Sequence, residues 1–511
     1  MKLIYKIEFN STNFYFKHII DDLISNTKVN IKAKMYKGFI LLICNDTKEE
    51  LEIFFKILEE KLPNSIFLAN SEFIDKFDFD VNLELEEKDI KINLSLLTND
   101  EIVKITSENN IDFSNDINKI KKGGVSRFET HNGLKDLFLP SLKIRKEFES
   151  KGYEVKLLIT NINKLSTLLE VSKKDLQLLC SIERPLIKLK FKHSQNINNE
   201  YSNTNFIYAK IADDKETVLF SQSLKKEGID YLLYVNDDVY QDGLKVTYTQ
   251  SQNIIIHGEK GIFPKYDYEL KRKVFSCNDY FEEYGSIYKS ILAQFDKKYV
   301  PSIGIYFSQK SEESAIKINV PSLGEKDVIL IPNVLNNIEN CLEDIKNIDE
   351  NAARLVINYK KKFSKYFEEE FIKKDFNSFA SILNLLSYIM GIKNNNEFED
   401  TALSYDGENA LQINMNIIKI DGKRYLDYRK IIQSIMSYKI ADVDNSKLAY
   451  SFYESLAEFI NTNVILINEE LNAENLILCG DLFSNQILLS EIKKANDSMN
   501  IIIPKEYPLD Y

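Results

Sequence analysis

Two hydrophobic periods alternate over the first 75 residues, and this alternation constrains the fold more than any other feature of the sequence. The segments KLIYKIEF, VNIKAKMYKGFILLICN and SIFLANSEF have the pattern of strands, the second being divided at Gly38. Between them, FYFKHIIDDLISN and KEELEIFFKILEEKL have the period of amphipathic helices. An order of strand, helix, two strands, helix and strand is the split βαβ plan. The sequence therefore predicts a ferredoxin-like domain over residues 1–75.

The rest of the chain is too long for a single core. At 511 residues the sequence suits roughly three domains of about 150 residues. Residues 76–111 are acidic, Asn-rich and weakly patterned, and we expect a connector with short strands. Helices and strands mix over residues 112–268, and residues 269–511 run from strands through helices to a final strand, turn and helix. The expected fold class is a multidomain protein of α+β and α/β type.

Charge and cysteine content exclude several classes of protein. A formal net charge of -12 does not provide the clustered positive surface that nucleic-acid binding needs. The five cysteines are scattered without a CxxC pair, so no zinc ribbon is expected and a reducing cytoplasm is favoured. The N-terminus has no signal-peptide pattern, and no apolar run approaches the ~20 residues of a membrane span. We expect a cytoplasmic protein without a membrane span.

Six motifs occur in one consistent order along the chain. They are LKIRKEFESKGYE, VSKKDLQLLCSIERPLIKL, IIIHGEKGIFPKYDYEL, FNSFASILNLLSYIMGI with SYDGENAL, LAYSFYESLAEF, and LILCGDLFSNQILL. Together these motifs resemble the HypF family, the carbamoyltransferases that mature [NiFe]-hydrogenases. The resemblance implies an acylphosphatase-like domain at 1–75, a YrdC-like domain at 112–268, and a truncated Kae1-like part of the actin/Hsp70 ATPase type at 269–511.

The acylphosphatase-like chemistry of the family needs an arginine and an asparagine that this sequence lacks. In HypF proteins a guanidinium clamps the phosphate and an amide orients water. Here Lys17 stands where the arginine is expected, and the asparagine position falls on Ala33 or Lys34. Lysine cannot reproduce the bidentate fork of arginine. The connector at 76–111 contains no cysteine, so the family's zinc finger is missing as well.

In the YrdC-like part, three cations survive at close spacing. Lys143, Arg145 and Lys146 correspond to a family motif that holds phosphate, and they would bind ATP if the site persists. The other interpretation is a solvated face of an amphipathic helix. Against a nucleotide site, Glu129 lies where the family has a Lys-Gly motif, and AKIA at 209–212 replaces an adenylate-binding motif.

The metal site of the Kae1-like part has lost its histidines. The family holds its metal through closely spaced histidines, whereas the last histidine of this chain is His257. The segment that would carry them is deleted between about 370 and 377 by this alignment. Asp510 matches the family's C-terminal metal-site aspartate. We therefore expect no metal.

The strand-turn-helix LILCGDLFSNQILL corresponds to a family turn at which phosphate can bind. Gly480 and Asn485 match family positions, but Asp481 replaces a second glycine. A carboxylate at this point can cap the following helix, which makes phosphate binding unnecessary. Asp481 is accordingly interpreted as an N-cap, with a catalytic acid or ligand as the other interpretation.

Core periodicity persists along the chain while the chemistry-bearing residues are replaced at each family site. The sequence therefore predicts a pseudoenzyme: a non-catalytic HypF-like accessory protein that binds a [NiFe]-hydrogenase subunit or another maturation factor, with no cofactor. One alternative is a divergent carbamoyl- or adenylyltransferase that binds ATP. Another is an RNA-linked role, which the acidic charge disfavours. Residues 377–511 form a Kae1-like lobe or, alternatively, a helical remnant packed on the middle domain.

Overall fold

The computed structural model of the chain divides into two compact units. The described residues are 2–11, 14–75, 84–85, 111–130, 133–192, 199–236, 245–248, 254–256, 262–263, 275–276, 286–295, 297–309, 314–332, 334–335, 337–368, 379–393, 395–407, 409–496, 498–504 and 509–510. The first unit comprises Met1–Ser202, Phe206–Val246 and Ile262–Phe275. The second unit comprises Asn203–Asn205, Thr247–Gly261 and Ser276–Tyr511. Of the expected connector, only residues 84, 85 and 111 are described.

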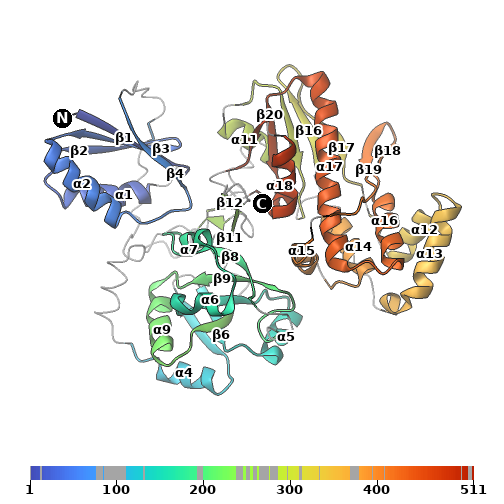
Figure 1. Cartoon of the computed structure of the whole chain (residues 1–511), viewed down its shortest axis with the longest axis horizontal. Helices are drawn as coiled ribbons and strands as arrows, with labels where there is room; N and C mark the ends of the chain where they lie inside the picture. Colours follow the sequence, from blue (N-terminus) through green and yellow to red (C-terminus); the bar gives the residue numbers. More distant parts are fainter. Residues whose placement is uncertain are drawn as a thin grey trace. The chain divides into compact units, whose positions relative to one another are not determined.

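An antiparallel sheet with two helices on one face forms the N-terminal domain (Figure 1). Its elements are β1 (Lys2–Phe9), α1 (Tyr15–Ser25), β2 (Ile31–Tyr36), β3 (Phe39–Asn45), α2 (Lys48–Lys61) and β4 (Leu68–Ile74). The strand order β2-β3-β1-β4 places β3 between β1 and β2, which is the split βαβ arrangement that the alternating periods predict. Phe9 of β1, Phe16 of α1 and Phe54 of α2 are fully buried between the two layers.

A mixed sheet forms the middle of the chain. Its elements are α4 (Ser114–Lys121), β5 (Ser126–Thr130), β6 (Gly133–Phe138), α5 (Leu142–Ser150), β7 (Lys156–Ile159), η3 (Ile162–Lys164), α6 (Leu165–Leu168), α7 (Lys173–Leu179), β8 (Leu186–Lys190), β9 (Phe206–Ile211), α9 (Lys215–Lys226), β10 (Tyr231–Asn236), β11 (Lys245–Tyr248) and β12 (Ile254–Ile256). The strand order is β12-β11-β8-β9-β7-β10-β6-β5. The strands β13 (Ile262–Phe263) and β14 (Phe275–Ser276) form a separate pair.

Part of one face of the middle sheet is an apolar core closed by α4 and α9. Leu137 of β6, Leu158 of β7 and Leu232 of β10 share this core with side chains of both helices. On the opposite face, Phe138 of β6 stacks on Phe148 of α5, with ring centroids 5.3 Å apart. Helices therefore cover both faces of this sheet, but α4 and α9 cover only the part of their face that carries the leucines.

The second unit is built on a sheet with helices on both sides. Its elements are α11 (Ile287–Gln294), β15 (Ser302–Tyr306), β16 (Ala315–Val320), β17 (Gly324–Leu330), α12 (Ile338–Lys346), α13 (Glu350–Lys362), η5 (Ser364–Glu368), α14 (Phe379–Met390), α15 (Asn395–Leu403), β18 (Ile417–Ile420), β19 (Lys423–Leu426), α16 (Tyr428–Ile440), α17 (Asn445–Leu471), β20 (Asn475–Cys479), η6 (Asp481–Ser484), α18 (Gln486–Ala495) and β21 (Asn500–Ile502). The strand order is β18-β19-β17-β16-β15-β20-β21, with β15, β20 and β21 parallel.

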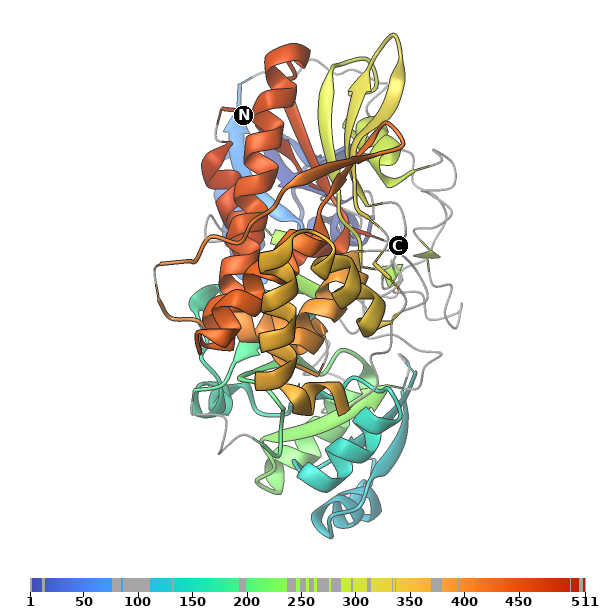
Figure 2. The ribbon, with the colours of Figure 1, turned by 90° about the vertical axis from the view of Figure 1, so that its right-hand side faces the viewer.

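The alternation of side chains along β15 shows which helices cover which face. Gly304 lies under the ring of Tyr288 from α11, so closely that a Cβ at position 304 would lie 2.3 Å from the ring. Ile303 and Ile305 point to the other face, where they join a large core with α14 and α17. In Figure 2 the long helix α17 runs alongside the strands. No helix in the described part of the chain is both long and apolar enough to cross a bilayer.

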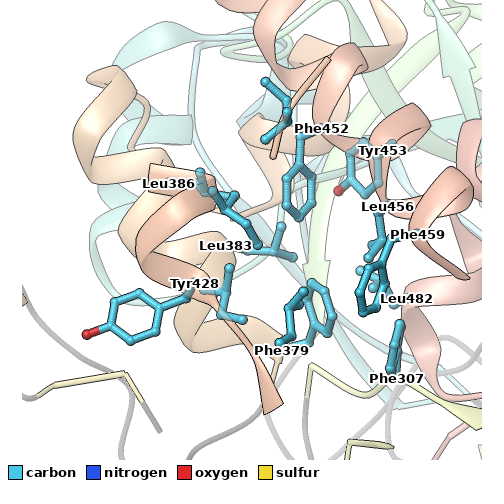
Figure 3. Close-up of a cluster of buried hydrophobic side chains, with 14 of the residues drawn as sticks. Phe307, Phe379, Leu383, Leu386, Tyr428, Phe452, Tyr453, Leu456, Phe459 and Leu482 are labelled. Atoms are coloured by element: carbon cyan, nitrogen blue, oxygen red, sulfur yellow. The ribbon is translucent and has the colours of Figure 1, made fainter. Parts of the chain in front are cut away.

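Aromatic side chains from widely separated segments fill the core of the second unit (Figure 3). The ring of Phe307, which follows β15, lies 5.0 Å from that of Phe379 in α14. It also stacks on Phe483 of η6 at 6.1 Å. Residues 377–511 thus share one core and one sheet with β15–β17. The alternative of a helical remnant packed on the middle domain is therefore wrong.

Candidate functional site

In the N-terminal domain, the residues at the family's phosphate site have partners of their own. The ammonium group of Lys17 lies 2.6 Å from the carboxylate of Asp21, one turn later on α1. Ala33 is buried on β2, and Lys34 pairs with Glu84 at 2.5 Å. The hydrogen bond that Lys34 donates to the carboxylate of Glu84 raises the pKa of Lys34. A lysine held in an ion pair stands where acyl-phosphate cleavage needs a guanidinium fork.

The three cations that the sequence places in a phosphate site do not form one cluster. All three lie on α5, but Lys143 and Lys146 are exposed whereas Arg145 is fully buried. The Arg145 guanidinium pairs with Glu149 at 2.5 Å and donates to the backbone oxygen of Asn199 at 2.9 Å. Residues four apart share one side of a helix, and here that side faces the chain near Asn199. The solvated-face interpretation therefore describes the two lysines and is wrong for Arg145.

Other lysines, which sequence reasoning missed, lie together on one face of the middle sheet. Lys210 of β9 is the register partner of Leu158, and Lys156 lies two residues before Leu158 on β7. Lys135 of β6 lies two residues before Leu137, which shares a core with Leu158. Lys188 of β8 pairs with Tyr208, two residues before Lys210. Lys245 of β11 pairs with Leu186, two residues before Lys188. Because side chains two residues apart share a face, these residues form one surface, the lysine face: Lys135, Lys156, Lys188, Lys210 and Lys245.

Four of these lysines are nearly inaccessible to solvent. Lys135, Lys156, Lys210 and Lys245 are 3%, 5%, 1% and 8% exposed, respectively. Removing an ammonium group from water is unfavourable by several kcal/mol unless an anion and hydrogen bonds compensate for it. The structure must therefore supply an anion to each of them.

Three carboxylates supply the compensation. Asp213 lies 3.3 Å from the ammonium of Lys135 and 2.5 Å from that of Lys210. Asp214, the N-cap of α9, lies 3.2 Å from Lys135. Burial opposes the ionisation of Asp214, but Lys135 and the hydrogen bonds from Thr217 outweigh it and hold the pKa of Asp214 below its usual value. The first group of lysines is therefore neutralised from the loop between β9 and α9.

Glu154 neutralises a second pair of lysines. Its carboxylate lies 3.4 Å from Lys156 and 2.8 Å from Lys245. Glu154 precedes β7, and strands β8 and β9 lie between β7 and β11. The carboxylate therefore joins lysines from strands that are not adjacent in the sheet. Lys245 and Lys188 also lie 4.4 Å and 5.2 Å from the centroid of the Tyr208 ring.

The lysine face also includes the buried polar side chain of Asn236. Asn236 ends β10, next to Lys135 in the register, and its side chain is 8% exposed. Within the described part of the chain, neither its amide nitrogen nor its amide oxygen has a hydrogen-bond partner. A buried amide left unpaired is unfavourable by about 1–3 kcal/mol. The position is therefore suited to a small polar molecule that donates and accepts hydrogen bonds.

In the second unit, three family positions meet where β15 and β20 end. These strands are parallel, so their carboxyl ends lie at one edge of the sheet, which we call the carboxyl edge. The N–H of Gly480 donates to the carbonyl of Leu509 at 2.7 Å. The N–H of Asp481 donates to the carboxylate of Asp510 at 3.2 Å, and the hydroxyl of Tyr306 donates to the same carboxylate at 2.9 Å. Gly480, Asp481 and Asp510 are thus brought together, and Asp481 binds Asp510 directly.

Asp481 does not cap a helix, contrary to the sequence prediction. Its carboxylate accepts a hydrogen bond from the backbone N–H of Gln309 at 2.6 Å. The cap of α18 is Asn485, whose side-chain oxygen accepts from the N–H groups of Ile487 and Leu488, both at 3.1 Å. The prediction is wrong because the short helix η6 separates the turn from α18 and moves the helix start to Asn485.

A close approach of two backbones holds the carboxyl edge shut. Gly480 has φ +94, and a Cβ there would lie 2.1 Å from the carbonyl oxygen of Phe307. The same carbonyl accepts from the N–H of Leu482 at 3.2 Å. The N–H groups of Gln309 and Asp481 at this edge donate to carboxylates of the chain itself.

The donors at the carboxyl edge do not fit a metal centre. Both oxygens of Asp510 accept hydrogen bonds, one from Tyr306 and the other from Asp481. Among the residues that the structure describes, no group of three His, Cys, Asp or Glu side chains is placed to bind a metal ion. Two parts of the sequence prediction, His257 and the segment 370–377, lie outside the described residues.

Comparison with known proteins agrees with this architecture. Residues 335–510 match the model of a family described as carbamoyltransferase, Kae1-like domain, second subdomain. The crystal structure of full-length HypF in its phosphate- and nucleotide-bound form has a TM-score of 0.59 and 10% identity, covering 100% of this chain and 96% of that chain. HypF of T. kodakarensis has a TM-score of 0.63 and 11% identity, with the same coverage of 100% and 96%.

A curated relative is more similar in sequence but is matched over a shorter length. Protein HydE of Wolinella succinogenes is 22% identical over 314 residues, which are 59% of this chain and 53% of the relative. The chain thus spans about half the length of the curated relative that it matches.

The fold and the matched subdomain define the class as a multidomain α/β protein with a carbamoyltransferase-type Kae1-like part. The chain has the fold of HypF along its length, and residues 335–510 carry the sequence pattern of the carbamoyltransferase Kae1-like subdomain. The resemblance inferred from the sequence motifs is confirmed.

Proposed function

We propose that this chain is a non-catalytic HypF-like accessory protein of [NiFe]-hydrogenase maturation that acts by binding. The hydrogenase connection rests on the role of the HypF family, and the binding role rests on the state of its sites. The observation that carries the proposal is the carboxyl edge. There the backbone N–H groups of Gln309 and Asp481 donate to the chain's own carboxylates, and a phosphate has no free donor at these two positions.

Two other family sites support the same proposal. The lysine in the acylphosphatase-like domain is paired with Asp21, and the arginine of α5 is buried against Glu149. The middle domain and the second unit nevertheless keep large buried hydrophobic cores. A chain that keeps its fold while its reactive groups bind one another is suited to presenting a surface. Its expected partner is a hydrogenase subunit or another maturation factor.

The proposal is tested by affinity capture with the full chain from hydrogen-oxidising cells. The captured proteins are compared with those from cells grown without hydrogen and from an untagged strain. Enrichment of a hydrogenase subunit or a maturation factor is the expected result. Recovery of unrelated proteins alone would contradict the proposal.

A second candidate function is favoured by the lysine face. A divergent carbamoyl- or adenylyltransferase would bind ATP, and the buried ammonium groups of the lysine face are suited to phosphate. The two locations for such a site are separable by calorimetry. If ATP binds at α5, Lys143→Met with Lys146→Met should weaken it. If ATP binds at the lysine face, Lys210→Met should weaken it. An affinity unchanged by either set would refute this candidate.

A further inference from the structure

The lysine face needs an explanation that neither the fold nor the binding role provides. A sheet of this kind is ordinarily completed by apolar side chains, as the other part of the same face is. Instead, ammonium groups from separate strands converge on this face, and four of the five are met by a carboxylate. We propose that Asp213 and Glu154 are built-in counter-anions, which fill the anion positions of the lysine face and close it to phosphate-containing ligands. The inference deepens the non-catalytic part of the proposed function and rests on it.

The position of Asp213 is that of a ligand rather than of a neighbour on the sheet. Its carboxylate bridges Lys135 and Lys210, which come from β6 and β9. Strands β10 and β7 lie between β6 and β9. The two lysines therefore reach Asp213 from opposite sides, as they would reach a phosphate oxygen between them. Asp213 itself comes from the loop after β9.

Glu154 repeats this arrangement with a second pair of strands. Its carboxylate bridges Lys156 of β7 and Lys245 of β11, again across two intervening strands. Two carboxylates from separate loops thus each join two lysines that are not adjacent in the sheet. A single ion pair explains one charge, whereas this repetition gives each of two pairs of lysines a bridging carboxylate.

The relative exposure of the groups shows how the carboxylates close the face. The side chains of Asp213 and Glu154 are 12% and 27% exposed, against 4%, 1%, 6% and 10% for the lysines that they join. The carboxylates therefore lie on the solvent side of the ammonium groups. An anion that approaches from water meets a negative charge before it reaches a lysine, and like charges repel most strongly where solvent is excluded.

The test is a gain of binding, which an ordinary structural ion pair does not predict. Binding of inorganic pyrophosphate and of ATP to the full chain is measured by calorimetry for the wild type, Asp213→Asn, Glu154→Gln and the double variant. Each single variant should bind pyrophosphate at least tenfold more tightly than the wild type, and the double variant more tightly still. Adding Lys210→Met to Asp213→Asn should abolish the gain, which locates the site.

A matched control removes an acid from an exposed pair. Glu227 lies 2.6 Å from Lys121, with the two side chains 49% and 40% exposed. Glu227→Gln makes the same chemical change away from the lysine face and should leave pyrophosphate binding at the wild-type level. A gain in this control equal to that of Asp213→Asn would reduce the effect to net charge and overturn the proposal.

Asp213→Asn leaves the buried ammonium of Lys210 without its carboxylate, so its stability is measured as well. If the variant is unfolded alone, pyrophosphate should refold it, because a ligand that binds only the native state stabilises that state. If the variant stays unfolded with pyrophosphate, the proposal is tested by the pyrophosphate affinity of Glu154→Gln, because Glu154 is more exposed. Tight pyrophosphate binding by the wild type, or folded variants without a gain, would overturn the inference. Capture of hydrogenase proteins by the wild type is unaffected by either result, so failure of the two proposals is distinguishable.

Discussion

The lysine face and the carboxyl edge solve the same problem with different chemistry. Both gather polar hydrogen-bond donors of this chain, and in both the chain's own carboxylates accept from them. At the lysine face the donors are ammonium groups, and Asp213 joins two of them. At the carboxyl edge the donors are neutral: Asp481 accepts from a backbone N–H, and Asp510 from an N–H and a hydroxyl.

Because the donors differ, different interactions stabilise the two sites. Charge pairs in a buried site depend on every partner, because a lone buried charge is strongly unfavourable. Hydrogen bonds to backbone N–H groups depend instead on how closely the chain segments approach, which Gly480 permits. The lysine face should therefore respond to changes of charge, and the carboxyl edge to changes of backbone shape.

The largest effect is expected from a methyl group at the carboxyl edge. Gly480→Ala places a Cβ 2.1 Å from the carbonyl oxygen of Phe307, at φ +94. Backbone strain of roughly 1–3 kcal/mol and overpacking of roughly 1–3 kcal/mol should together lower the free energy of unfolding by about 4 kcal/mol. Gly324→Ala is the control, because its φ is +72 but a Cβ there meets nothing within 4 Å. Urea unfolding should show a loss of about 1 kcal/mol for the control, and equal losses would contradict the account.

Breaking a charge pair at the lysine face should be the next largest effect. Asp213→Ala removes the carboxylate that lies 2.5 Å from the ammonium of Lys210, and we expect a loss of about 3 kcal/mol in urea unfolding. Replacing both charges, as Lys210→Met with Asp213→Leu, should recover most of this loss, because an apolar pair needs no compensation. Lys135 keeps Asp214 in either variant. A double variant no more stable than Asp213→Ala would show that the loss is not one of charge.

Glu183 is a buried carboxylate whose hydrogen-bond donors are neutral, unlike the ammonium groups that pair with Asp213. Glu183 lies in the same unit as the lysine face but accepts from the hydroxyls of Tyr15 and Ser65, both at 2.5 Å, and from the N–H of Ile66 at 3.0 Å. Burial raises the pKa of Glu183 above its ordinary value of 4.5, and these hydrogen bonds only partly offset it.

The raised pKa fixes the sign of a pH dependence. Between the unfolded pKa and the raised folded pKa, the native state binds more protons, so this group makes stability fall as the pH rises. Its contribution is fully present below about pH 4.5 and is lost as the pH passes through the raised value. The slope cannot exceed about 1.4 kcal/mol per pH unit. Chemical denaturation of Glu183→Gln against the wild type should show the variant gaining relative stability with pH, and parallel curves would contradict this.

The smallest effect is expected at the cap of α18. Asn485→Ala removes the acceptor for two N–H groups, which should lower the free energy of unfolding by about 1 kcal/mol. Asp481→Asn keeps an oxygen that accepts from Gln309 and should change stability less. The reverse ranking of these two variants in thermal unfolding would restore Asp481 as the cap.

The sequence predicts those parts of the fold that depend on local periodicity. The split βαβ order of residues 1–75 follows from alternating strand and helix periods, and the structure has this order. The sequence predicts the turn at Gly480 but not the N-cap of α18 at Asn485, because the short helix η6 gives no periodic signal. Arg145 has a helical pattern typical of an exposed residue, and its burial depends on Asn199, a contact that sequence distance hides.

The lysine face could not be predicted because its members lie on five different strands. The order and register of these strands decide which lysines lie close together, and the sequence states neither of them. One signal was present: single lysines inside apolar strands, as in KLLI, LIKLK and FIYAKI. A lysine at an inward position of such a strand requires a buried anion, so this pattern can be searched for before a structure exists.

The central claim is that the chain keeps the HypF fold while its own side chains occupy the sites of chemistry. The most direct test is carbamoyl-phosphate-dependent conversion of ATP to AMP and pyrophosphate by the purified full chain, beside an authentic HypF under the same conditions. The account predicts no pyrophosphate above background from this chain while the control turns over. Turnover by the wild-type chain would show that at least one site remains open, and it would contradict the account.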